Sequence, residues 1–159
     1  MDAVMRYQVA DYLATGDDKF ALMGVGFNTL DENPTAQKDA KTYINQKAQT
    51  TQIKSYQPTF PFDTDLISDE EAVMAIYDIG RNQKTSEDAE LDYVRVELFK
   101  PVADKENVFE ARKFKVAVEV ANITGEGGGI MKVTGNLNGV GDFVAGTFDT
   151  TTKTFTATE

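Results

Sequence analysis

Carboxylates crowd the segment 61–92, and their type and spacing come closest to a chemical site in this sequence. Four of them stand at positions one, three, seven and nine of a possible calcium-binding loop: Asp63, Asp65, Asp69 and Glu71. Such a loop also needs a glycine at position six and a glutamate at position twelve. This chain has Ser68 and Met74 at those positions, so the calcium loop is excluded.

Two further patterns suggest chemistry but lack essential parts. Neighbouring carboxylates such as Asp63 and Asp65 serve as acid and base in hydrolases only when a pocket raises one pKa strongly. A glycine-rich segment, 125–129, has the composition of a phosphate cradle. Phosphate cradles lead into a helix with a Lys-Ser or Lys-Thr pair, whereas a strand pattern follows here. We therefore predict a hairpin connection at these glycines.

The composition removes most enzyme classes. The chain has 159 residues and contains no Cys, His or Trp. Without these residues it has no disulfide, no thiolate metal site, no cysteine nucleophile and no histidine base. We expect no catalytic residue, no metal and no cofactor, and a single domain spanning 1–159.

The charge is strongly acidic and unevenly distributed. There are 16 Lys and Arg against 26 Asp and Glu, a net charge of -10, and segment 61–92 holds ten acids against two bases. Acidic surfaces repel phosphates and anionic lipid, so binding to nucleic acid or a membrane is disfavoured; solubility alone would also explain the acidity. No export signal and no run of about 20 apolar residues stands in the sequence, which predicts a cytoplasmic site of synthesis.

Segment 31–57 is predicted to be an extended arm or hairpin. Its large apolar residues are Tyr43, Ile44, Ile53 and Tyr56, among many Thr, Gln, Lys and Asn. We expect strand-like pieces near 41–47 and 51–60. Because so few apolar residues cannot bury a face, part of the ordering energy must come from another surface. The segment is either a floppy surface loop or an arm whose four apolar residues contact a neighbouring subunit.

One helix is predicted, over 68–79. Ser68 and Glu71 fit a capping box at its start, and Gly80 stands where a C-terminal cap is expected. Apolar residues between Ala72 and Ile79 supply one buried side, so the helix should lie across a sheet.

Alternating strands dominate the rest of the chain. We expect one strand over 20–30 with a bend at its glycines, and leave 4–13 unassigned. The C-terminal region 93–157 shows the clearest period of two, with Val94, Val96 and Leu98 on one face of its first strand and Tyr93 on the other, polar face. The predicted fold is mainly β, an antiparallel β-sandwich or split barrel with one short α-helix.

Whole phrases of the sequence resemble the small major tail proteins of tailed bacteriophages and prophages of Gram-positive hosts. They are the segments 6–13, 30–34, 65–83, 93–101 and 123–156. The C-terminal run is the most telling, where a Thr-Gly-x-Leu strand end at Thr134 precedes Gly141-Asp142, Gly146-Thr147-Phe148 and a closing Phe155-Thr156. The resemblance extends along nearly the whole chain.

The resemblance implies a tail tube protein located in the virion tail and assembled in the cytoplasm of the host bacterium. Subunits of this family form stacked hexameric rings whose sheets join into a hollow tube around a tape-measure protein, with initiator and terminator proteins at the ends. Double-stranded DNA passes through the lumen without specific binding. A lumen of negative charge would repel it, and Glu97 and Glu119 are the lumen-lining candidates on the strands.

Three alternatives stay open at this point. The tube could be the inner tube of a contractile tail or of a tail-like bacteriocin rather than that of a flexible, non-contractile tail. A different class of function is a soluble β-sandwich module that binds carbohydrate or peptide, although the chain lacks Trp for an aromatic platform. An acid-base hydrolase would need a carboxylate with a strongly raised pKa in a pocket.

Overall fold

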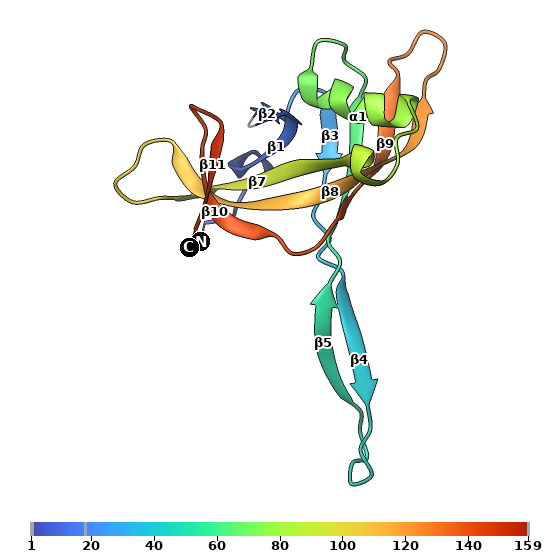
Figure 1. Cartoon of the computed structure of the whole chain (residues 1–159), viewed down its shortest axis with the longest axis vertical. Helices are drawn as coiled ribbons and strands as arrows, with labels where there is room; N and C mark the ends of the chain where they lie inside the picture. The colour runs from blue at the N-terminus through green and yellow to red at the C-terminus, as the bar shows by residue number, and fades with distance from the viewer. Residues whose placement is uncertain (1, 18, 159) are drawn as a thin grey trace.

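The computed structural model describes residues 2–17 and 19–158, and it is mainly β with a single α-helix in that range. A curled antiparallel sheet forms the body, α1 lies at one end, and a two-stranded hairpin projects from the other end (Figure 1). The elements are η1 (Arg6–Gln8), β1 (Val9–Gly16), β2 (Lys19–Leu22), β3 (Phe27–Leu30), β4 (Ala36–Lys41), β5 (Thr50–Tyr56), β6 (Thr59–Asp65), α1 (Glu71–Arg81), η2 (Ser86–Ala89), β7 (Glu90–Pro101), β8 (Val108–Thr124), β9 (Lys132–Gly139), β10 (Val144–Asp149) and β11 (Thr154–Ala157). The predicted fold class is confirmed.

Strand β8 divides the sheet. The main order is β2-β1-β7-β8-β9-β6-β3, with β10 and β11 branching from β8. One edge of β8 pairs with β7, whereas its other edge is shared between β10 over 108–113 and β9 over 116–124. Because β10 and β9 pair with successive parts of the same edge of β8, the sheet divides there into two branches, which produces the split barrel.

Two hydrophobic clusters lie on opposite faces of β7, which corrects the predicted polar face of this strand. Tyr93 is fully buried in the larger cluster, where its ring packs against Phe60 and Phe114. Val94 and Val96 are fully buried in the smaller cluster on the other face. The strand is therefore buried on both faces, because the sheet curls around each side of it. On β8 the predicted apolar face is confirmed, since Phe114, Val116 and Val118 are buried.

The helix begins and ends later than predicted. It starts at Glu71 after a turn in which the Glu70 amide donates to the Ile67 carbonyl, and no side chain caps it. The expected Ser68 cap and the Gly80 C-cap are both wrong. Gly80 lies inside the helix, and a Cβ atom there would stand 2.7 Å from the Cβ of Val120, so this glycine lets α1 lie directly on β8. No helix in the described ranges is both long and apolar enough to cross a membrane.

The expected strand over 20–30 is two strands at opposite ends of the sheet. Residues 23–26 turn between β2 and β3, with Gly26 at φ +97°. The Met23 amide donates to the Asp11 carbonyl, and the Asp65 amide donates to the Gly26 carbonyl. This short connection ties β1 to β6 and so brings the two ends of the curled sheet together. Segment 4–13, left unassigned, contains η1 and the first part of β1.

The hairpin predicted within 31–57 is present, but its strands differ from the expected ranges. Residues 42–49 form the tip, where the Gln46 amide donates to the Tyr43 carbonyl, so strand β4 precedes the predicted piece at 41–47. The predicted piece at 51–60 is divided at Pro58. Residues before it belong to β5 in the hairpin, and residues after it belong to β6 in the main sheet.

Candidate assembly interface

The arm, residues 36–56, projects from the body as a separate two-stranded sheet (Figure 1). The four predicted contact residues all lie on it, each with more than half of its surface exposed: Tyr43, Ile44, Ile53 and Tyr56. Ile44 at the tip is fully exposed. Four large apolar side chains exposed on one segment are typical of an interaction surface.

A β-bulge places Ile53 and Tyr56 on one face of the arm. The register pairs Lys38 with Ile53 and Gln37 with Ser55, so Lys54 is an extra residue in β5. Directly paired residues share a face. Tyr56, opposite Ala36, therefore shares a face with Ile53, opposite Lys38, although the two are three positions apart in the chain. The sequence alternation alone would have placed them on opposite faces.

The root of the arm is fastened to the body. The chain entering the arm pairs with the chain leaving it at Asn33 and Thr59, and the Gln57 amide donates to the Thr35 carbonyl. Both terminal nitrogens of Arg112 on β8 donate to the two carboxylate oxygens of Glu32 at 2.8 Å. This bidentate pair fixes the direction in which the arm leaves the sheet. The hydrogen bond from Arg112 lowers the pKa of Glu32 although partial burial opposes it.

A buried carboxylate continues the same network beneath the root. Asp11 on β1 is only 2% exposed, and it accepts hydrogen bonds from Tyr93, Arg6 and Arg95. Arg95 also reaches Glu32 at 3.5 Å. Burial, followed by the charge of Asp11, raises the pKa of Tyr93 well above its usual value. The carboxylate thus has three donors, as a buried charge requires.

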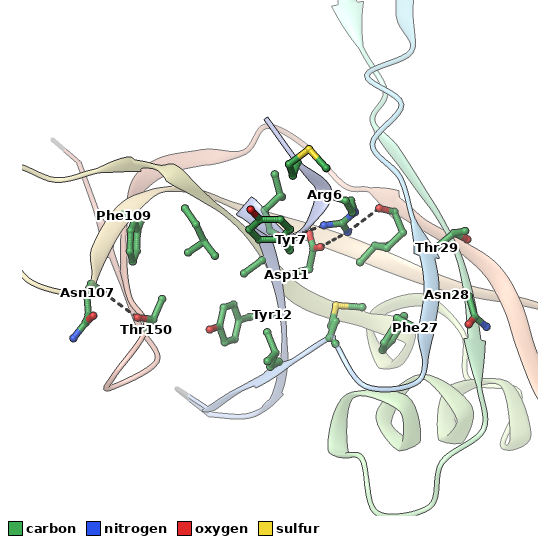
Figure 2. Close-up of a pocket in the computed structure, with 18 residues that line it drawn as sticks. Arg6, Tyr7, Asp11, Tyr12, Phe27, Asn28, Thr29, Asn107, Phe109 and Thr150 are labelled. Carbon is green, nitrogen blue, oxygen red and sulfur yellow. Dashed lines mark hydrogen bonds and ion pairs between the residues drawn. The ribbon is translucent and has the colours of Figure 1, made fainter. Parts of the chain in front are cut away.

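A groove follows the seam where β1 and β3 approach without pairing (Figure 2). It has a volume of about 910 Å³ and is lined mainly by apolar residues of η1, β1, β3 and the 107–109 region. Arg6 bridges it, donating to Asp11 at 2.8 Å and to the Leu30 carbonyl at 3.1 Å. The network therefore closes the half-barrel with side chains where the backbone ladder is missing.

The two lumen-lining candidates lie on opposite faces of the sheet. Glu97 pairs with Glu110 and Tyr93 pairs with Phe114, with no bulge between these two pairs. Residues four apart on a regular strand lie on the same face, so Glu97 lies on the face of the larger core. Glu119 lies nine residues beyond Glu110 on β8 and points to the other face. Glu97 is half-buried and contacts Lys100 at 3.5 Å, whereas Glu119 is exposed and accepts a hydrogen bond from Asn138. The two side chains cannot face one lumen together.

Glu119 belongs to a polar sheet face that sequence reasoning missed. The pairing register places seven further charged residues of β6, β7, β8 and β9 on the same face: Asp63, Asp65, Glu90, Asp92, Lys113, Lys115 and Lys132. With Glu119 the face holds five carboxylates and three lysines, all at least partly exposed. Helix α1 packs on the opposite face of β8, where Val116 and Val118 are buried. The alternation of polar and apolar residues along each strand indicated a polar side. Only the pairing register shows that the polar sides of these strands form one surface.

The residues first considered for chemistry do not form a metal centre. Among residues 2–17 and 19–158, no group of three or more acidic side chains is arranged to hold a metal ion. Asp63 and Asp65 both accept a hydrogen bond from the Asn28 amide, at 3.4 and 3.1 Å. The glycine-rich segment connects β8 to β9, as the hairpin prediction required.

No protein-family model matches this chain, and no curated protein matches it significantly.

Proposed function

We propose that the chain is a structural virion protein that self-assembles into the hollow tube of a flexible, non-contractile phage tail. The projecting arm is the observation that supports this most directly. The apolar side chains on one face of its ribbon, Ile53 and Tyr56, are each more than half exposed. An isolated two-stranded hairpin is marginally stable in water, so a second copy that covers the apolar face explains why this hairpin is retained.

The sheet edges support the same proposal. Strands β2, β3 and β11 each pair on one side only. An unpaired strand edge is a template for pairing with another chain. In the proposed assembly these edges join neighbouring subunits of a hexameric ring, and the rings stack around a tape-measure protein between initiator and terminator proteins.

The acidic sheet face around Glu119 is proposed to line the lumen. Five carboxylates against three lysines give it a net negative charge, which repels the phosphates of DNA in transit. Glu97 is not part of this face. A tube structure in which the wall of the lumen is net positive would contradict this assignment.

Negative-stain electron microscopy of the purified, concentrated protein, with light scattering of a dilution series, tests the proposed function. We expect hollow tubes or stacked rings of uniform width, and a scattering mass that rises with concentration. A protein that stays monomeric at every concentration, including after addition of a tail initiator complex, would contradict the proposal and favour a binding module.

A further inference from the structure

The arm is basic although the chain as a whole is acidic. Residues 36–56 contain four lysines and one aspartate, a net charge of +3 in a chain of net charge -10. The lysines are Lys38, Lys41, Lys47 and Lys54, and all four are exposed. None takes part in an ion pair within the described residues. The positive charge of the arm is therefore uncompensated inside the subunit.

The α1 end carries the opposite charge. Residues 66–89, which contain α1 and η2, hold six acids against two bases. Asp69, Glu71 and Asp78 are exposed, and Glu71 and Asp78 lie seven residues apart on one side of the helix. No ion pair in the described part of the chain includes any of the six acids.

Exposed apolar side chains lie on two loops beside the segment that leads into α1. Val25, Ile130 and Met131 are 64%, 67% and 46% exposed. The loop with Val25 and the loop with Ile130 and Met131 are each hydrogen-bonded to the segment that leads into α1. The Asp65 amide donates to the Gly26 carbonyl, and the Leu66 amide donates to the Met131 carbonyl, each at 2.8 Å. The α1-end surface, which we define as residues 66–89 with Val25, Ile130 and Met131, thus combines apolar and acidic groups. The arm combines apolar and basic groups.

We propose that the arm of one copy docks on the α1-end surface of a second copy. This inference rests on the proposed function and names the receiving surface within it. The apolar face with Ile53 and Tyr56 covers the exposed apolar loops, while the arm lysines pair with the carboxylates of the helix. Each strand of the arm runs about ten residues from root to tip, and at roughly 3.3 Å per residue the arm extends about 30 Å from the body.

The positions of the two surfaces determine the kind of assembly. The arm and α1 lie at opposite ends of the long axis of the molecule (Figure 1). A contact between different surfaces at opposite ends is head-to-tail, and it extends without closing on a dimer. The inferred contact therefore gives the assembly a direction, with every arm pointing the same way, and makes its growth sensitive to salt.

A charge-swap experiment tests the inference. The first variant, K38E/K41E/K54E, reverses three arm lysines, and the second, D69K/E71K/D78K, reverses three carboxylates of the α1 end. A third chain combines both sets. The matched control, K100E/K105E/K153E, changes the net charge as the first variant does, but at exposed lysines outside the arm, the α1-end surface and the edge strands β2, β3 and β11. Circular dichroism establishes that each chain is folded, and sedimentation with electron microscopy measures the concentration at which tubes form.

We expect each single set to raise the concentration required for tubes at least about tenfold, because like charges then meet across the contact. The combined chain should return to within about threefold of wild type, and the control should stay within about twofold. Single-set variants that form tubes at the wild-type concentration would overturn the inference and leave the proposed function standing. So would a folded combined chain as defective as the single sets. Wild-type protein that forms no tubes contradicts the proposed function, and this inference with it.

Discussion

Strands β7 and β5 show how differently the body and the arm are stabilised. β7 buries Tyr93 on one face and Val94 on the other, whereas six of the seven residues of β5 are exposed. Fixing the backbone costs about 1–2 kcal/mol for each residue, and the body offsets this cost by burying apolar surface. The arm has no such compensation within its own subunit. The body therefore has the burial it needs to fold alone, whereas in the proposed assembly a second copy completes the arm.

The boundary between the two regions is a set of charged contacts. Glu32 stands at the root of the arm and receives both hydrogen bonds from Arg112, which belongs to the body. Arg95 connects this pair to the buried Asp11. A rigid root matters because an arm held in one direction loses less entropy when it docks.

The largest expected effect comes from placing a charge in the body. Val116 is fully buried, so Val116→Asp should destabilise the fold by about 4 kcal/mol or more and leave little folded protein. Urea denaturation followed by circular dichroism measures it. Ile53→Asp makes the same kind of change on the exposed face of the arm and should leave stability within about 0.5 kcal/mol. Equal losses in the two variants would remove the distinction between body and arm.

A methyl group between the helix and the sheet should have the next largest effect. Gly80→Ala introduces a Cβ atom 2.7 Å from that of Val120, so we expect a loss of about 1–3 kcal/mol from overpacking. Helix propensity alone predicts a gain of about 1 kcal/mol. Gly127→Ala, where nothing lies within 4 Å, is the matched control. Thermal unfolding that shows Gly80→Ala to be more stable would place α1 farther from β8.

Removing the charge at the arm root should cost less. Glu32→Gln is expected to lower stability by about 1–2 kcal/mol at neutral pH, because Arg112 loses a charged partner. The lowered pKa of Glu32 means that its contribution is present above pH 4.5, its ordinary value, and is lost as the pH falls below it. Denaturation at pH 7 and pH 3 should show the difference from wild type shrinking with acid. Glu106→Gln, at an exposed loop residue, is the control; a difference that grows with acid would contradict the ion pair.

The smallest effect on stability, and the largest on assembly, is expected from shortening the arm. Deletion of residues 39–51 should leave the melting temperature within a few degrees of wild type, since these residues lie outside the main sheet and all but Thr50 are exposed. Tubes should be absent by electron microscopy. Normal tubes from the deletion would show that the arm does not dock on a neighbour.

Local patterns in the sequence were sufficient for much of the fold. Period-two alternation located the core of β8, and the apolar run from Ala72 to Ile79 located the buried side of α1. The scarcity of apolar residues identified the arm as an exposed hairpin. These predictions succeeded because each depends on residues close in the chain, where backbone geometry fixes which side chains share a face.

The tertiary structure alone decided what those elements meet. Glu32 and Arg112 are 80 residues apart, and only the curling of the sheet joins them. The same curling buries Tyr93 on a face that its polar neighbours indicated was exposed. An extra residue at Lys54 brings Ile53 and Tyr56 to one face, and the strand register sends Glu97 and Glu119 to opposite faces. Sequence periodicity is a local property, whereas register, bulges and sheet closure depend on pairing between distant segments. The sequence alone therefore determined the helix and strands of this protein, and only the tertiary structure determined which residues share its surfaces.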